Sequence, residues 1–413
     1  HKQSWNYLIK SGFWAKFYKI VPGLFMAYMI PAFLTTSGLI APEWTSVAES
    51  GTETEHSSNL YYMASRYLLP AALVLMTLSI DLKAVFNLGP KALIMFFTGT
   101  IGIVIGGPLA ILLISTISPD TVGGVGPDAV WRGLATLAGS WIGGGANQAA
   151  MLEIFKYNPE KYGGMVLVDI VVANLWMAVV LLGVGKSNKI DNWLKADNSA
   201  IEELKNKMQA FADKVTRTPS LTDYIMILSI AFVAVGIAHF GATNISDFLT
   251  GNFEAVSDKK SALSSFGSQF FWMITIATLI GIGLSFTKFK NYEGAGASKF
   301  GSICIYILVA TIGMKMNIFT IFENPGLIAI GLVWMTIHAL LLIIVAKIIK
   351  APYFFLAVGS QANVGGAASA PVVAAEFHPS LATVGVLLAV FGYAVGTYGA
   401  IFCAYLMELA SKV

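Results

Sequence analysis

The sequence has few charged residues. Aspartate, glutamate, lysine and arginine make up only 12% of the 413 residues, and 56% are hydrophobic. Soluble domains carry about 25% charged residues, which they need to cover their surface. The net charge of +3 is too small to indicate a nucleic-acid partner. The lack of charge therefore excludes an ordinary soluble domain and indicates a protein whose main surroundings are membrane lipid.

Cysteines and familiar catalytic motifs are also scarce. The two cysteines, Cys304 and Cys403, each lie inside an apolar run, so the sequence predicts neither a disulfide framework nor a cysteine metal site. There is no paired-histidine motif, no recognisable Ser/His or Asp/Asp dyad and no nucleotide-binding loop. We therefore expect neither an enzyme nor a bound cofactor, beyond a coupling ion such as Na⁺ or H⁺.

What the sequence does contain is apolar runs of about 20 residues, the length that crosses a hydrocarbon core. Most should be helices, because only helices and closed barrels satisfy the backbone in lipid, and barrel-type alternation is missing. The sequence thus predicts an all-α, multi-pass protein of a bacterial inner membrane. The runs lie near 17–40, 62–80, 91–117, 129–157, 163–186, 223–241, 268–287, 300–317, 325–349, 352–377 and 381–409.

Glycine interrupts two of these runs. Residues 129–157 contain Gly143-Gly144-Gly145, and residues 352–377 contain Gly365-Gly366 close to Pro371. Neither sequence holds a regular helix well. We interpret both segments as either broken crossing helices or re-entrant hairpins.

A polar, lysine-rich stretch divides the chain. It predicts a cytoplasmic linker at 187–222, between a first membrane repeat at 1–186 and a second at 223–413. Ser199 and Glu202 form a capping-box pattern. We expect an amphipathic surface helix after it, because apolar residues follow at helical spacing. They are Ile201, Leu204, Met208, Phe211 and Val215.

The two halves resemble each other. Thr77–Leu82 resembles Thr311–Met316, Gly143–Asn147 resembles Gly365–Ser369, and the order of elements is the same in both halves. The run at 223–241 has no partner in the first half. We therefore expect a further span before residue 1; the alternative is that 223–241 is simply an added helix.

Loop charge favours hairpins over crossing helices. With hairpins, the most basic loops share one side of the membrane, and the acidic 41–60 loop lies outside. Lysines beside the first hairpin count mildly against this arrangement. Each complete half would then have five spans, which inverts the second repeat, and the hairpin tips would approach each other from opposite faces, as in many transporters.

The broken segments are the predicted binding site. A break exposes free N–H groups, which suit a carboxylate or phosphate, and free carbonyls, which suit Na⁺. We expect a small anionic solute to bind there, and close helix packing through small residues is the alternative. The candidate residues are Ser140, Gly143, Gly144, Gly145, Asn147, Gln148, Ser360, Gln361, Asn363, Gly365, Gly366 and Ser369.

Ion coupling is predicted at a carboxylate inside the membrane. Asp169 lies within the apolar sequence Val166–Val171, with Asn174 five residues further on. Intramembrane carboxylates are functional by default, although a structural ion pair is the alternative. We predict coupling roles for Asp169, Asn174, Asn147 and Asn363, and propose Na⁺ ligands only at Asn147 and Asn363.

Other polar residues have more than one interpretation. Arg66 begins an apolar run and either snorkels or binds a solute carboxylate. His338 lies in a long apolar helix and either packs through hydrogen bonds or relays protons. Arg132, Glu153 and Glu376 flank the broken segments, where we expect them to face water.

The last apolar run carries Gly392, Gly396 and Gly399 on one face. Small residues at this spacing allow close packing between membrane helices. We expect this face to lie against a hairpin.

At Gly139–Gln148, Ser360–Pro371 and Gly392–Tyr398, the sequence resembles the YjcL-type family of bacterial integral membrane proteins, a family of unknown function. The resemblance spans essentially the whole chain and implies a further span before residue 1. More distantly, the layout is similar to the sodium-coupled glutamate and citrate symporters. That likeness implies inverted repeats, a scaffold domain, a transport domain that moves as an elevator, and a homodimer.

Together these features favour a symporter that couples a small carboxylate-bearing solute to Na⁺ or H⁺. The alternative is a passive channel or facilitator for small anions, which would show no dependence on a coupling ion.

Overall fold

The computed structural model describes residues 23–47, 53–80, 85–197, 201, 204, 218–257, 264–317, 319, 324–378 and 381–412. Five of its helices are long and apolar enough to cross a membrane, or six if the bent pair Gln269–Ser285 and Lys288–Ala295 forms one span. The prediction of a helical, multi-pass membrane protein is therefore confirmed, although the chain also contains one pair of β-strands.

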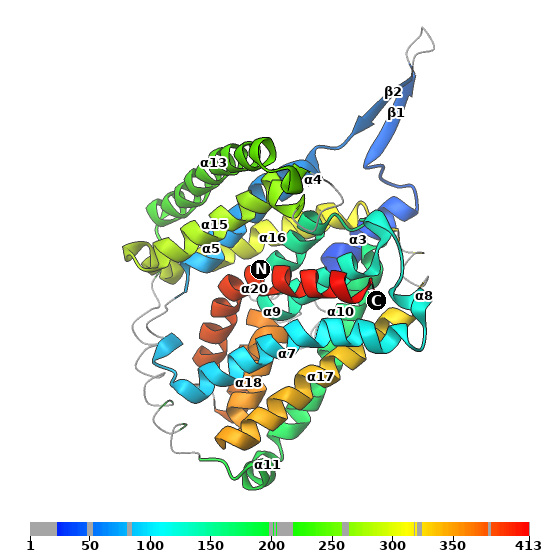
Figure 1. Ribbon diagram of the computed structural model, residues 1–413. Coiled ribbons are helices and arrows are strands. Elements are labelled where there is room, and N and C mark those ends of the chain that lie inside the picture. The colour runs from blue at the N-terminus through cyan, green and yellow to red at the C-terminus, as the bar shows by residue number, and fades with distance from the viewer. Residues whose placement is uncertain are drawn as a thin grey trace.

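The helices form two bundles, which occupy the lower and upper parts of Figure 1. We call the lower one the hairpin bundle. Its helices are α7 (Pro90–Ser115), α9 (Val130–Phe155), α10 (Tyr162–Val184), α17 (Gly326–Ile349), α18 (Tyr353–Val364), α19 (Gly366–Phe377) and α20 (Ala382–Ala410).

The second group surrounds α5, and we call it the α5 bundle. It contains α3 (Gly23–Thr36), α5 (Leu69–Leu78), α13 (Leu221–Asn252), α15 (Gln269–Ser285) and α16 (Ala297–Gly313). The two bundles meet where α5 and α15 contact α9 and α20, and where α16 contacts α9. Each half of the chain contributes helices to both bundles.

Glycines bring α7 close to α17. A Cβ added at Gly102 would lie 3.0 Å from the Cα of His338, and one added at Gly106 would lie 2.6 Å from Cδ1 of Trp334. Lipid tails are as apolar as the helix surfaces, so burial of apolar side chains does not drive helices together in a membrane. Helix association depends instead on close contact of this kind. This packing places the inner faces of α7 and α17 beside the hairpins.

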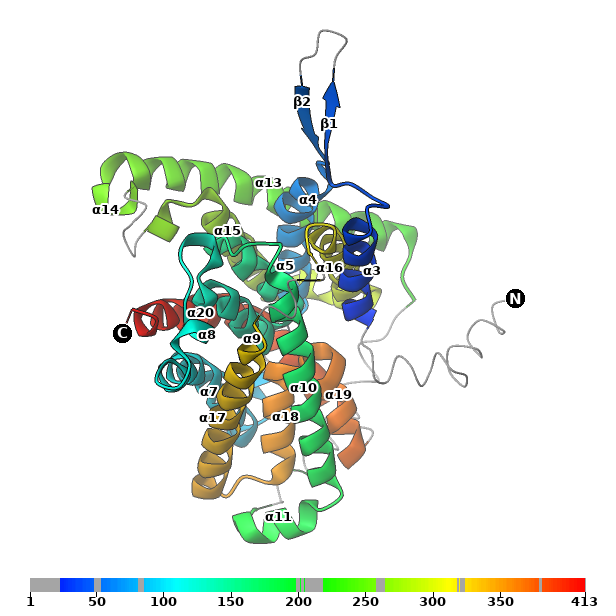
Figure 2. The same cartoon turned by 90° about the vertical axis from the view of Figure 1, so that its right-hand side faces the viewer.

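The acidic segment that the sequence predicted as an outside loop forms an antiparallel β-hairpin. Strands β1 (Glu43–Val47) and β2 (Glu53–Ser57) pair in register, and the ring of Trp44 stacks on His56 at 5.6 Å. Aromatic and β-branched residues favour strands. The hairpin projects away from the helices in both Figure 1 and Figure 2.

The predicted linker begins with a short helix that the sequence analysis did not identify, α11 (Ser187–Leu194). Of the expected amphipathic helix, Ile201 and Leu204 are described, and the other residues named for it lie outside the described part of the chain. The remaining short elements are α4 (Leu60–Met63), η1 (Ala64–Leu68), α8 (Pro119–Val122), η2 (Gly126–Asp128), α14 (Glu254–Ser257), η3 (Ser264–Gly267) and η4 (Lys288–Ala295).

Candidate functional site

The first glycine-rich segment doubles back on itself. At Gly144 the backbone adopts φ 71° and ψ −172°, a conformation that side chains other than glycine rarely adopt. The rings of Trp131 and Phe155, near the two ends of α9, are 5.6 Å apart. A straight helix would separate these residues by about 36 Å. The segment is therefore a hairpin with its tip at Gly143–Gly145, and we call it the first hairpin.

The second glycine-rich segment reverses in the same way. The rings of Phe354, near the start of α18, and Phe377, at the end of α19, are 5.3 Å apart. A continuous helix would separate them by about 35 Å. The chain turns at Gly365 and Gly366, where Gly366 has a φ of 55°. Of the two interpretations of the broken segments, the geometry is that of hairpins, and we call α18–α19 the second hairpin.

Both tips rest on the glycine face of α20. A Cβ added at Gly392 would lie 2.9 Å from the carbonyl oxygen of Ile142 and 3.4 Å from that of Ala362. A Cβ added at Gly396 would lie 2.4 Å from the Cα of Gly143. The expectation that this face packs against a hairpin is confirmed, and the structure adds that it receives both.

Asp169, on α10, faces the first hairpin. Its Oδ2 accepts hydrogen bonds from Ser140 Oγ at 2.7 Å and from Gln148 Nε2 at 3.2 Å, and its Oδ1 accepts one from Trp141 Nε1 at 2.7 Å. Within the described part of the chain, no basic side chain forms an ion pair with Asp169. The structure therefore shows a carboxylate held by neutral donors on both sides of the hairpin tip.

Asn147 ties the first hairpin to α20. Its Oδ1 accepts from Thr397 Oγ1 at 2.5 Å, and its Nδ2 donates to the carbonyl oxygens of Gly143 and Tyr393 at 2.8 and 3.2 Å. One of these carbonyls lies four residues before Asn147, and the other lies four residues before Thr397.

Asn363 makes the same set of contacts between the second hairpin and α7. Its Oδ1 accepts from Thr100 Oγ1 at 2.8 Å, and its Nδ2 donates to the carbonyl oxygens of Gly359 and Phe96 at 2.9 and 3.0 Å. Again, each carbonyl lies four residues before the asparagine or the threonine. We call Asn147–Thr397 and Asn363–Thr100 the two asparagine clasps. Because protein groups already contact both carboxamides, Na⁺ binding at these residues stays a prediction.

A network of hydrogen bonds centred on His338 connects the helices α7, α17, α18 and α10. His338 Nδ1 lies 2.9 Å from the carbonyl oxygen of Gly99, and its Nε2 lies 2.8 Å from Ser360 Oγ, which also accepts from Trp176 Nε1 at 2.7 Å. A carbonyl only accepts, so Nδ1 donates, and in a neutral ring Nε2 accepts the proton of the Ser360 hydroxyl. His338 is thus hydrogen-bonded on both sides, as a packing residue requires.

Replacing His338 with phenylalanine is expected to destabilise the fold by about 2 kcal/mol, because the Gly99 carbonyl loses its side-chain donor and the Ser360 hydroxyl loses its acceptor. Trp176→Phe is the matched control: it removes only the outer donor and should have roughly half the effect. Unfolding of the purified protein in detergent measures both. Equal losses of stability in the two variants would contradict a hydrogen-bond network that is centred on His338.

The tip of the second hairpin contains a donor without a partner. Ser369 Oγ donates to Gln361 Oε1 at 2.8 Å, across the turn at Gly365 and Gly366. Gln361 is fully buried, and among the described residues its Nε2 has no hydrogen-bond acceptor.

The remaining predicted coupling residue, Asn174, donates within its own helix to Ile170 O at 2.7 Å.

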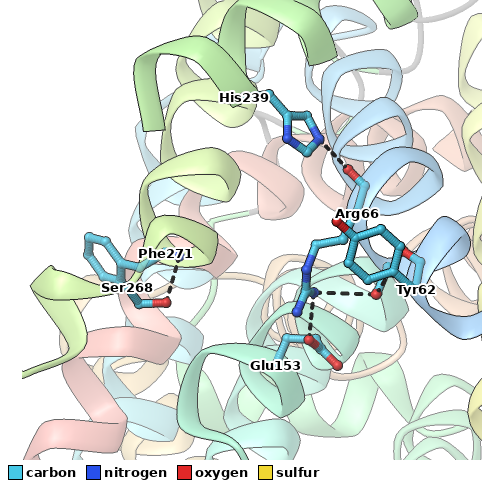
Figure 3. Close-up of polar contacts among 7 residues, drawn as sticks. Tyr62, Arg66, Glu153, His239, Ser268 and Phe271 are labelled. Carbon is cyan, nitrogen blue, oxygen red and sulfur yellow. Dashed lines mark hydrogen bonds and ion pairs between the residues drawn. The ribbon is translucent and has the colours of Figure 1, made fainter. Parts of the chain in front are cut away.

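Arg66 and Glu153 form an ion pair at 2.7 Å between the two bundles (Figure 3). Arg66 lies in the π-helical turn η1, and its guanidinium also stands over the ring of Phe270 at 4.4 Å. His239 contacts the backbone carbonyl of Arg66 at 2.9 Å. The sequence analysis identified Arg66 and Glu153 separately and missed their pairing, because 87 residues separate them.

Charged residues close the base of the first hairpin. Arg132 Nη1 donates to the carbonyl of Phe155, and Asp128 accepts from Asn158 at 2.8 Å and pairs with Lys161 at 3.0 Å. The Asn158 amide, and then the Lys161 ammonium, hold the pKa of the Asp128 carboxyl below its usual value. At the other hairpin, Glu376 is exposed, as expected.

Comparison with known proteins agrees with this membrane architecture. The family described as "Protein of unknown function (DUF819)" matches residues 5–409. The chain belongs to this family. It is also 25% identical, over 346 residues, to the "Uncharacterized membrane protein YjcL" of Bacillus subtilis (strain 168), with 83% of this chain and 82% of that protein covered. The resemblance to the YjcL-type family is therefore confirmed.

This family membership extends over both hairpins and both bundles. It supports a multi-pass membrane protein. The chemistry has to be argued from the site itself, since a shared fold does not determine function.

Proposed function

We propose that the protein is a secondary active transporter that moves a small carboxylate-bearing solute together with Na⁺ or H⁺ across the bacterial inner membrane. The observation that carries this proposal is the meeting of two glycine hairpin tips on α20, with Asp169 bonded beside the first tip. Irregular backbone at membrane depth is tolerated where it is buried in protein or lines a wet cavity.

The second hairpin supports an anionic solute. Helix α19 begins at Gly366 without a side-chain cap, so its first N–H groups are free of such a partner. A helix N-terminus carries a partial positive charge and attracts carboxylates. The unpartnered Gln361 Nε2 adds a second donor near the same turn. A carboxylate oxygen would satisfy both kinds of donor.

The arrangement of the bundles suggests how the site would move. The order of α7, a hairpin and α10 recurs as α17, a hairpin and α20, which supports two inverted repeats. In our proposal the hairpin bundle carries the solute as an elevator, and the α5 bundle stays fixed as the scaffold of a homodimer. Exposed apolar side chains on α13, including Phe232, Phe240 and Phe248, are available to lipid or to a second copy.

Solute counterflow in proteoliposomes tests the proposal. Protein-containing vesicles loaded with succinate, citrate, L-glutamate or glycylglycine should take up the same labelled compound, with saturable kinetics, for at least one of these solutes. Beforehand, a thermal-shift screen against Na⁺, Li⁺ and a carboxylate library narrows the choice, because a ligand stabilises the state that it binds. Conductance with flux that does not saturate would support a channel, and no exchange with any carboxylate would contradict a carboxylate transporter.

A further inference from the structure

The hydrogen-bond partners of Asp169 differ in what they can do. Trp141 Nε1–H only donates, so Oδ1 remains an acceptor whether or not the carboxyl group is protonated. The Ser140 hydroxyl donates or accepts, and the Gln148 carboxamide has both a donor and an acceptor end. These two groups face Oδ2. Oδ2 is therefore the atom whose surroundings fit both an ionised and a protonated carboxyl group.

The same partners fit Na⁺ poorly. Na⁺ sites in transporters use carbonyl and carboxylate oxygens that present lone pairs to the ion. Two of the three groups around Asp169 are N–H donors, which present hydrogens, and a metal ion would have to displace them. Asn147 and Asn363, the other candidate ligands, direct their Oδ1 atoms at threonine hydroxyls.

No charge compensates Asp169 within the described residues. Two phenols, Tyr28 of α3 and Tyr162 of α10, lie within electrostatic reach of Asp169, and their oxygens are 3.4 Å apart. Helix α9 presents only the three neutral donors to it. Asp169 is part-buried within an apolar helix, and a carboxylate without a compensating charge is unfavourable there, so gaining a proton would relieve it.

The titratable groups on the other elements packed against α10 are engaged elsewhere or exposed. His338 of α17 contacts Gly99 and Ser360, and Tyr353 of α18 donates to Val180 O at 2.8 Å. Asp191 of α11 accepts from the backbone N–H of Tyr353 at 2.7 Å, and Lys189 of α11 and Glu376 of α19 are exposed. Lys347 of α17 donates to the carbonyl oxygen of Trp193, Arg132 of α9 donates to that of Phe155, and Glu153 of α9 pairs with Arg66.

We propose that the coupling ion is a proton and that it binds to Oδ2 of Asp169, where the new O–H donates to one acceptor, Ser140 Oγ or the carboxamide oxygen of Gln148, while the other group keeps donating to Oδ2. This assignment rests on the transport function proposed above. Binding forms one O–H bond, which neutralises the carboxylate, and release on the other side of the membrane restores the charge. Because Tyr28 belongs to the α5 bundle, the change in charge occurs at the contact between the bundles.

Infrared spectroscopy of the purified full chain tests proton binding without knowledge of the solute. Lowering the pH should produce the carbonyl band of a protonated carboxyl group that is missing in Asp169→Asn and present in Glu376→Gln, an exposed control. Gln148→Leu removes a donor to the ionised form and should move the midpoint of this band to higher pH. Replacing choline with Na⁺ should leave the band unchanged. A band that persists in Asp169→Asn, or that Na⁺ suppresses, would overturn the assignment.

Transport measurements separate this proposal from the proposed function. Proteoliposomes that contain the pH-sensitive dye pyranine should acidify inside when succinate, citrate, L-glutamate or glycylglycine is added, without Na⁺. Asp169→Asn should lose this acidification, Asp169→Glu, which keeps a carboxyl group, should retain it, and the exposed control Glu376→Gln should keep both acidification and solute exchange. Solute accumulation driven by a Na⁺ gradient, with equal pH on the two sides, would refute proton coupling but would still support a transporter. A wild-type protein that binds the proton but exchanges no solute would refute the transporter instead.

Discussion

Replacing Gly396 with alanine is expected to destabilise the protein by about 3 kcal/mol, at the upper end of the usual range for an overpacked core. The new Cβ would lie 2.4 Å from the Cα of Gly143 and 2.9 Å from its backbone nitrogen. Backbone atoms cannot rotate away as a flexible side chain can, so the first hairpin would have to leave α20. The melting temperature of the purified protein in detergent measures the effect.

Gly236→Ala is the matched control. Gly236 lies in the exposed part of α13, and a Cβ added there meets no atom within 4 Å. Alanine favours helices over glycine by about 1 kcal/mol, so this variant should melt at the same temperature as the wild type or slightly higher. Similar losses in the two variants would show that the contact of Gly396 with the first hairpin tip does not hold in the folded protein.

Replacing Glu153 with alanine is expected to cost about 2 kcal/mol of stability and to disturb the contact between the bundles. It leaves the Arg66 guanidinium without its carboxylate, beside the ring of Phe270. Breaking a buried pair costs about 3–5 kcal/mol, and we take a lower value because 28% of the Arg66 side chain and 13% of the Glu153 side chain remain exposed. Unfolding in detergent gives the free-energy change.

A double-mutant cycle isolates the interaction itself. Arg66→Met with Glu153→Met should be more stable than Glu153→Ala alone, because neither charge is left without a partner. The pair Lys412–Glu408 on α20 is the control, since 60% of the Lys412 side chain is exposed. Its coupling energy should stay below about 0.5 kcal/mol. An equally small coupling between Arg66 and Glu153 would contradict a structural link between the bundles.

The sequence indicated where the chain breaks, because the reasons are local. Gly143–Gly145 and Gly365–Gly366 lack the side chains that favour a helix, and this shows without knowledge of any partner. The spacing of the small residues Gly392 and Gly396 likewise predicted a close helix contact. Loop charge favoured hairpins, but only the approach of Trp131 to Phe155 and of Phe354 to Phe377 shows that both segments turn back.

The sequence also marked Asp169, because a carboxylate in an apolar run stands out by composition alone. It did not reveal Trp141 as a partner, since an indole in an apolar helix looks like any other packing residue. It identified Asn147 and Asn363 as polar residues beside the breaks but assigned them to an ion. The threonines that bond them, Thr397 and Thr100, lie 250 and 263 residues away along the chain.

The sequence by itself thus determined the membrane class, the two glycine breaks and the carboxylate between them. These features depend on the composition and spacing of neighbouring residues, which set how a segment partitions into lipid and whether it stays helical. Only the tertiary structure decided which side chains meet: the asparagine clasps, the Arg66–Glu153 pair and the two bundles. Such contacts arise from helices packing at close range across long sequence separations, and no local pattern records which surfaces come together.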